Sequence, residues 1–313
     1  MRGLLYTFLL YSMLSCSGAV EKAKPPRDSV SPPDVTGSVR LDFLQTFGQN
    51  IGISSPGGIS FGIDGTLYVC DRDRSSIVRL DNDGTVISRF EGFASCGERM
   101  FVPVDVCTSS GLAVYTVDAV NSRVIRFDRF LKNAGVIYRK DADSTRRFGT
   151  FNGLAFDTAT GDLFITDSDT GAVIRIDMLG GTIQTMGEFG TVKNSMKSPA
   201  GLDVTDDGTL YIADEGYGAL AVVKHFGGEI RYIGEKVLEA PVDAVALPGG
   251  KVAVADRRGI LIMSETGTPD GRAGYGVERN ISPRSVEYRD GKLYVSDGIS
   301  GLILVYIIDM DIK

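Results

Sequence analysis

The sequence predicts an all-β fold, a six-bladed β-propeller with four-stranded blades, and three observations lead to that prediction. A short apolar segment ending on aspartate recurs six times, at intervals of 41 to 49 residues. Each segment follows a glycine-containing turn, and each turn follows an apolar segment that begins at proline in five of the six units. Self-similarity with a period of roughly 40 to 50 residues is typical of propellers and solenoids. The recurring aspartates are Asp71, Asp118, Asp167, Asp214, Asp256 and Asp297.

The beginning of the chain is predicted to be an export signal. The apolar run from Gly3 to Leu14 is shorter than the roughly 20 helical residues that a bilayer requires. The segment from Ser12 to Cys16 resembles the lipobox of bacterial lipoproteins. That resemblance implies a lipoprotein signal peptide at residues 1–15 and a diacylated Cys16. The alternative is an ordinary signal peptide in which Cys16 is incidental.

Residues 16–38 are predicted to form a disordered, lipid-anchored tether. Residues 17–33 contain four prolines and almost no large apolar side chains. Such a segment buries too little surface to offset the entropy of ordering it. We therefore expect an exported protein held in the bacterial cell envelope, with the membrane as a partner through its lipid. Ser17 in place of aspartate resembles lipoproteins of an outer membrane, where the organism has one.

The remaining residues, 39–313, are predicted to form the propeller, with four strands in most units. The first strands begin at one aligned column: Pro56, Pro103, Phe151, Pro199, Pro241 and Pro283. A glycine-containing turn and the segment that ends on aspartate follow, as in a β-hairpin. A third apolar run comes next, such as 77–80, and a weaker fourth one, such as 86–90.

Both ends of this region are predicted to build one blade. The last unit lacks a fourth strand, and the segment 39–47 has no repeat of its own. Pairing of 39–47 with 302–308 would close the ring and leave no open sheet edge.

The repeat resembles the NHL repeat over about residues 39–308. The features that carry the resemblance are proline, glycine, an apolar residue, Gly-x-Leu-Tyr-Val-x-Asp and a strand of the form Ile-x-Arg-apolar. The chain has no tryptophan, which makes other propeller families poorer matches. The recurring aspartates are interpreted as structural, because an aspartate at a strand end accepts backbone N–H bonds from the next turn.

Metal-dependent chemistry is the alternative that the sequence keeps open. The residues after the proline column should line the mouth of the tunnel, and they are Gly57, Val104, Asn152, Ala200, Val242 and Arg284. The chain also resembles six-bladed gluconolactonases in plan, and the motif around Asn152 resembles one of their metal-ligand motifs. Ala200 stands where those enzymes carry a carboxylate. Asp105 and Asp243 would complete a ligand set only if a bulge turned them inward, because strand pleating points them away. We therefore favour no metal, no cofactor and no catalytic residue.

The single histidine limits histidine chemistry, because a Ser-His-Asp or Cys-His arrangement has just one candidate. His225 is the only histidine, which rules out a three-histidine zinc site, and it is expected at an exposed turn.

Arginines gather in the loops that follow the second and fourth strands, which share one face of a propeller. Guanidinium groups bind carboxylate and phosphate in a forked geometry, so this loop-rich face is predicted to hold an anionic or peptide ligand. The alternative is a mixed, solvated face. The predicted ligand-binding residues are Asn152, Arg284, Arg74, Arg99, Arg147 and Arg257.

Three cysteines follow Cys16. Cys70 and Cys96 belong to the loop-rich face, and a disulfide between them is expected in an oxidising compartment, whereas Cys107 should lie on the opposite face. Free buried thiols are the alternative.

The predicted function is that of a binding or scaffold module for a protein, peptide or glycan. The chain carries 33 basic and 40 acidic residues, a net charge of -7, and no basic tract, so nucleic acid is not expected as a partner. The competing predictions are a metal-dependent hydrolase or lactonase and a purely structural role in envelope assembly.

Overall fold

The computed structural model describes residues 35, 37, 39–92, 102–132, 135–140, 150–187, 195–274 and 280–310. The chain divides into the units Met1–Pro32 and Pro33–Lys313, and every described residue belongs to the second. The predicted signal peptide, Cys16, nearly all of the predicted tether, Cys96, Arg99 and Arg147 lie outside the described residues.

The predicted six-bladed β-propeller is confirmed. The described residues form six antiparallel sheets of four strands each and no helix. Within a sheet, strands that are neighbours in sequence pair with each other, except where the N-terminal strand joins the last blade. No helix of this part of the chain is long and apolar enough to cross a membrane.

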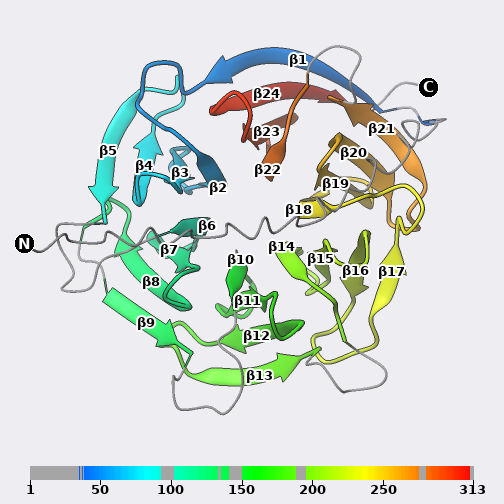
Figure 1. The fold of residues 1–313 in the computed structure, drawn as a ribbon, viewed down its shortest axis with the longest axis horizontal. Coiled ribbons are helices and arrows are strands. Elements are labelled where there is room, and N and C mark those ends of the chain that lie inside the picture. Colours follow the sequence, from blue (N-terminus) through cyan, green and yellow to red (C-terminus); the bar gives the residue numbers. More distant parts are fainter. Residues whose placement is uncertain are drawn as a thin grey trace, which may run out of the picture. The chain divides into compact units, whose positions relative to one another are not determined.

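Figure 1 shows the innermost strand of every blade, and each of these strands starts at the aligned column of the sequence. These strands are β2 (Pro56–Phe61), β6 (Pro103–Thr108), β10 (Phe151–Phe156), β14 (Pro199–Val204), β18 (Pro241–Leu247) and β22 (Pro283–Arg289).

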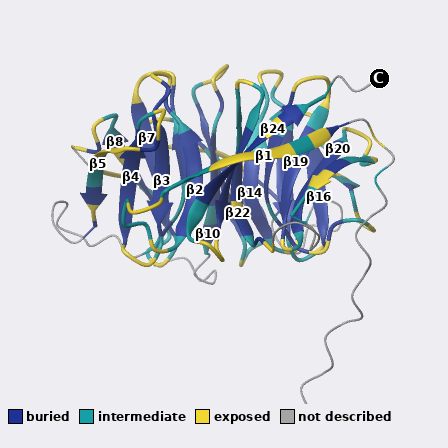
Figure 2. Ribbon diagram, turned by 90° about the horizontal axis from the view of Figure 1, so that it is seen from above, coloured by how far each residue is buried: buried dark blue, intermediate teal, exposed yellow. Residues whose placement is uncertain are grey.

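Two further strands of each blade lie outside the innermost one. The second strands are β3 (Leu67–Asp71), β7 (Ala113–Asp118), β11 (Leu163–Asp167), β15 (Leu210–Asp214), β19 (Lys251–Asp256) and β23 (Lys292–Asp297). The third strands are β4 (Ser76–Leu80), β8 (Arg123–Asp128), β12 (Ala172–Ile176), β16 (Ala219–Val223), β20 (Gly259–Ser264) and β24 (Leu302–Asp309). These strands are mostly buried, whereas the outermost ones are exposed (Figure 2).

The outermost strands include the N-terminal one. They are β5 (Val86–Glu91), β9 (Gly135–Arg139), β13 (Thr182–Met186), β17 (Arg231–Ile233), β21 (Pro269–Ala273) and β1 (Arg40–Phe47). As predicted, β1 completes the last blade. It pairs antiparallel with β24, from Arg40 opposite Asp309 to Phe47 opposite Ile303, with an irregularity between Phe43 and Gln45. The pairing joins the two ends of the propeller and covers the edge of β24.

The recurring aspartates are structural, as predicted, but they accept N–H groups from an earlier loop as well as from the next turn, where Tyr217 donates to Asp214 at 3.2 Å. Asp214 accepts backbone N–H groups of Lys197 and Ser198 at 2.9 Å each, and Asp71 accepts those of Ser54 and Ser55 at 3.0 and 3.1 Å. In both cases the donors belong to the loop that leads into the innermost strand of the same blade. All six aspartates are at most 1% exposed.

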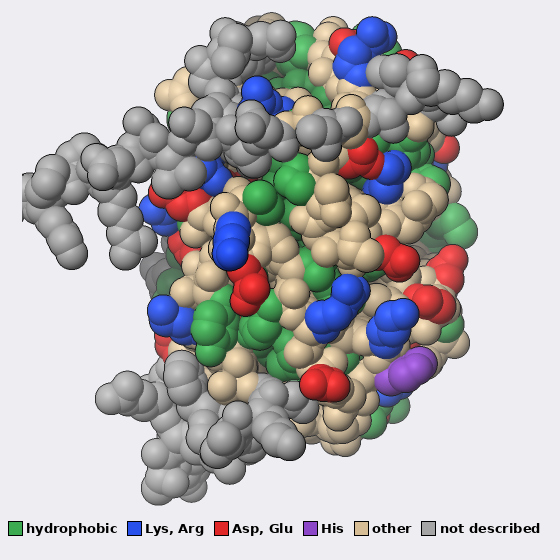
Figure 3. Space-filling view, turned by 90° about the vertical axis from the view of Figure 1, so that its right-hand side faces the viewer, with side chains coloured by type: hydrophobic (Ala, Val, Ile, Leu, Met, Phe, Trp, Pro, Cys, Tyr) green, Lys and Arg blue, Asp and Glu red, His purple; other side chains and the backbone are tan. Residues whose placement is uncertain are grey.

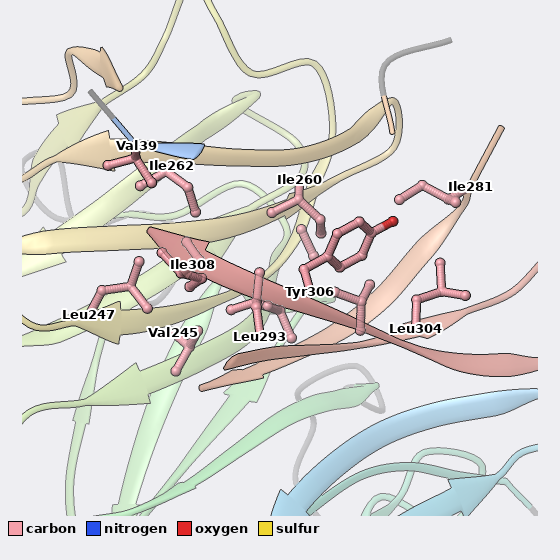
Figure 4. Packing of buried hydrophobic residues seen from close by; sticks show 14 residues of the cluster. Val39, Val245, Leu247, Ile260, Ile262, Ile281, Leu293, Leu304, Tyr306 and Ile308 are labelled. Carbon is pink, nitrogen blue, oxygen red and sulfur yellow. The ribbon is translucent and has the colours of Figure 1, made fainter. Parts of the chain in front are cut away.

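The hydrophobic core lies between successive blades. Figure 4 shows one such cluster, in which Val245 and Ile260 of the fifth blade pack with Leu293 and Tyr306 of the sixth. Every sheet therefore buries both faces against its neighbours, which explains the near-continuous apolar second and third strands.

Candidate functional site

All six innermost strands carry a register irregularity near their first residues. The register between first and second strand shifts directly after the aligned column, for example between Pro103 and Asp105 and between Pro241 and Asp243. Such a bulge breaks the strict alternation of side chains between two sides of a strand. The expectation that pleating turns Asp105 and Asp243 away is therefore wrong. Both aspartates line the central space.

The central space contains two cavities that share walls. The mouth cavity, of about 210 Å³, lies where the innermost strands begin, and its walls include Asn152, Arg284 and Arg72. The far cavity, of about 240 Å³, lies toward the other ends of these strands. Asp105, Asp243 and Ser285 belong to the walls of both cavities.

Buried and half-buried carboxylates join neighbouring blades around these cavities. Asp105 accepts backbone N–H groups from its neighbour Val106 at 2.9 Å and from Leu154 in the next blade at 2.7 Å. Asp243 does the same with Ala244 at 2.9 Å and Val286 at 3.0 Å. Such bonds satisfy N–H groups on strand edges that have no further strand to pair with.

Two more carboxylates repeat this arrangement, and the sequence analysis missed both. Asp203 accepts the N–H of Val204 and, in the next blade, that of Ala246, each at 2.8 Å. Glu287 accepts the N–H of Phe61 at 3.3 Å across the junction between the last and first blades. Asp203 and Glu287 are the fifth residues of their strands, two positions after the place that Asp105 and Asp243 occupy in theirs. Because side chains two positions apart lie on the same side of a strand, this spacing could have predicted them.

Burial shifts the acidity of these carboxyl groups. It raises the pKa of Asp105 to about 7, that of Asp203 to about 6 and that of Glu287 to about 8. Burial, followed by the charge of Asp105, raises the pKa of Asp243 well above its ordinary value. In the described part of the chain, none of the four forms an ion pair with lysine or arginine.

Two arginines from adjacent blades face the mouth cavity. Arg72 follows β3 in the first blade, and its backbone N–H donates to the carbonyl of Ser55 at 2.9 Å. Arg284 is the second residue of β22 in the sixth blade. Burial, and then the like charge of Arg284, lowers the pKa of Arg72. Neither guanidinium forms an ion pair with a described carboxylate.

Two other predicted ligand-binding residues, Arg74 and Arg257, are not walls of the mouth cavity. Arg74 is exposed, with its Nε 4.0 Å from the buried carboxylate of Asp71. Arg257 is exposed and donates to Glu215, a wall residue of the mouth cavity, at 3.0 Å. The structure thus brings Asn152 and Arg284 together at the mouth, and it adds Arg72, which was not among the six predicted residues.

The alternative metal ligands do share one cavity. Asn152, Asp105 and Asp243 all line the mouth cavity, but both carboxylate oxygens of each aspartate already accept backbone N–H groups. No group of three or more His, Cys, Asp or Glu residues in the described ranges is placed to hold a metal ion. A hard cation such as calcium requires six to eight oxygen ligands.

His225 lies outside these cavities. It follows β16 and is exposed on the outer side of the propeller, where charges of both signs are interspersed (Figure 3).

Two cysteine thiols lie in the interior. Cys70 is a free thiol, fully buried and 3.6 Å from the hydroxyl of Thr116. Its predicted partner, Cys96, lies outside the described residues, and because Cys70 is free the predicted disulfide is not formed in this structure. Cys107 is also a free, buried thiol, and it lines the far cavity.

Comparison with known proteins supports the fold alone. No protein-family model and no curated protein sequence matches the chain. Among solved structures, a streptogramin B lyase is similar with a TM-score of 0.63 and 15% identity, covering 85% of this chain and 87% of the lyase. A protein of unknown function from Bacteroides thetaiotaomicron is similar with a TM-score of 0.65 and 13% identity, covering 86% of this chain and 73% of the other. A chain of a nidogen/laminin complex gives a TM-score of 0.55 at 15% identity, covering 70% and 84%.

Proposed function

We propose that this chain is an NHL-type, lipid-anchored propeller of the bacterial cell envelope that binds a protein, peptide or glycan at its loop-rich face. The mouth cavity is the centre of that face in this proposal. The nidogen/laminin neighbour supports a protein ligand by analogy of fold, since propellers serve as platforms for many kinds of partner.

The observation that carries the proposal is the availability of Arg72 and Arg284. Both line the mouth cavity, and neither pairs with a described carboxylate. Two guanidinium groups side by side repel each other unless an anion lies between them. An acidic group of a ligand would supply that anion through forked hydrogen bonds.

Binding to peptide and glycan arrays tests the proposal. The mature protein is labelled and applied beside the variant Arg72→Ala/Arg284→Ala and the control Arg40→Ala. Arg40 is an exposed residue of β1 that pairs with Asp42. We expect that the parent protein and the control Arg40→Ala bind the same array ligands and that the double variant no longer binds them. A ligand set unchanged by the double variant would contradict binding at the mouth.

A metal-dependent hydrolase or lactonase is the second candidate, because Asn152, Asp105 and Asp243 line one cavity. Elemental analysis of the purified protein, with Asn152→Ala as the comparison, distinguishes the two functions. A stoichiometric divalent cation that is lost in the variant would establish the metal site and overturn the binding proposal.

A further inference from the structure

The mouth cavity has basic and acidic groups in its walls that form no ion pair with one another. They are the guanidinium groups of Arg72 and Arg284 and the carboxyl groups of Asp105 and Asp243. No ion pair links the two sets. Glu215 also lines the cavity, but it pairs with Arg257 at 3.0 Å.

Each of the two arginines lies over a glycine. A Cβ built on Gly57 would lie 3.2 Å from Cγ of Arg72, and one built on Gly298 would lie 2.8 Å from Nε of Arg284. Any larger residue at either position would force the arginine to move. The glycines therefore leave room for both cationic side chains to lie close to the backbone at the rim of the cavity, where Arg72 is half-buried and Arg284 is exposed.

The two aspartates have the same arrangement. A Cβ on Gly58 would lie 2.0 Å from Oδ1 of Asp105, and one on Gly201 would lie 2.1 Å from Oδ1 of Asp243. All four charged groups are thus packed against glycine, each glycine coming from a neighbouring segment. The two aspartates also accept backbone N–H groups, so they are fixed in place and lose little conformational entropy when a ligand binds.

The residues between the charged groups are small, and they are both apolar and polar. They are Gly58, Val104, Asn152, Ala200, Gly201, Val242 and Ser285. The volume of about 210 Å³ is below the roughly 300 to 1,000 Å³ of sites for drug-sized ligands. The enclosed part of a ligand must therefore be small.

We propose that the mouth cavity binds a small zwitterion of the α-amino acid type, with its carboxylate at Arg72 and Arg284 and its ammonium at Asp105 and Asp243. The carboxylate of a zwitterion supplies a counter-charge to the two arginines, and its ammonium favours the ionised form of the two aspartates. A monoanion, a monocation or an inorganic phosphate makes only one of these two interactions. This inference rests on the proposed binding function and names the ligand class of its central site.

Isothermal titration calorimetry of the mature protein with three matched probes tests the inference. The probes are L-alanine, N-acetyl-L-alanine, which lacks the ammonium, and L-alaninamide, which lacks the carboxylate. We expect L-alanine to bind at least tenfold more tightly than either derivative. Inorganic phosphate, added as a fourth probe, should bind no better than the derivatives.

Variants assign the binding to this cavity. Arg72→Ala and Arg284→Ala should each weaken L-alanine binding at least tenfold, and Gly298→Ala should weaken it by displacing Arg284. Arg40→Ala, on the outer strand, should leave it unchanged, and the urea midpoint of each variant confirms that it is folded. Failure of L-alanine to bind, equal binding of all three probes, or insensitivity to both arginine variants would overturn the inference.

The array experiment separates failure of this inference from failure of the proposed function. If array ligands depend on Arg72 and Arg284 but L-alanine does not compete with them, the zwitterion site is wrong and the binding function stands. If no array ligand depends on these arginines, the proposed function fails.

Discussion

Asp243 joins two blades through one carboxylate. Its Oδ2 accepts a hydrogen bond from the backbone N–H of Val286 at 3.0 Å, while Oδ1 accepts that of Ala244 at 2.9 Å. Asp105 and Asp203 make the equivalent bonds between other pairs of blades. The innermost strands, which have no strand beyond them, are therefore linked around the central space by side chains.

Loss of such a link should destabilise the propeller. We expect Asp243→Ala to lower the free energy of unfolding by about 1–3 kcal/mol, because buried N–H groups lose their acceptor. Asp42, in an exposed ion pair on β1, is the control, and its replacement by alanine should cost at most about 1 kcal/mol. Urea unfolding followed by circular dichroism measures both. Equal stability of Asp243→Ala and the parent would contradict a linking role.

The raised pKa values predict stability that falls as the pH rises. Asp105, Asp203 and Glu287 have pKa values of about 7, 6 and 8 in the folded protein, above the roughly 4 of unfolded carboxyl groups. Between these values the folded state binds more protons than the unfolded state, so the free energy of unfolding decreases with increasing pH. The urea midpoint should therefore be higher at about pH 5 than at about pH 8.

A single substitution checks the origin of this dependence. Glu287→Gln removes one titrating group and keeps an oxygen that can accept the N–H of Phe61. We expect the variant to lose less stability than the parent between about pH 5 and pH 8. A parent protein whose stability rises over this interval would contradict the assignment.

Closure by the N-terminal strand should be essential for folding. Deletion of residues 39–47 removes β1, exposes the edge of β24 and removes Val39 from the cluster around Leu293. We expect this variant to lose the cooperative unfolding transition. Deletion of residues 1–34 is the control and should retain it. A cooperative transition without residues 39–47 would show that the ring does not depend on β1.

Attachment to the membrane should depend on Cys16. We expect the parent protein in the detergent-soluble membrane fraction of the bacterial host and Cys16→Ser in the soluble fraction. Metabolic labelling with a fatty acid should mark only the parent. A parent that is released without a lipid would contradict the lipoprotein prediction.

The architecture was predictable because it repeats. The six aspartates and the aligned proline column indicate local turns and strand starts. The same pattern occurs in six units, so each unit supports the strand assignment of the others. The role of β1 was predictable because the last unit lacks a fourth strand and the segment 39–47 belongs to no unit of its own. Both inferences needed only the order of segments along the chain.

The site was predictable only in part, because it depends on backbone irregularity and on closure of the ring. The bulge that turns Asp105 and Asp243 inward breaks the alternation on which a strand prediction relies. Arg72 and Arg284 lie in the first and last blades and become neighbours only when the ring closes. Asn152 and Arg284 were found because they directly follow the aligned column.

The central claim is that function resides at the mouth of the propeller, at Arg72 and Arg284. The most direct test is NMR observation of the arginine Nε–H signals while a ligand selected on the arrays is added to the mature protein. We predict that the signals of Arg72 and Arg284 shift and that the signal of Arg40 does not. Shifts confined to arginines on the outer strands, with Arg72 and Arg284 unmoved, would contradict the claim.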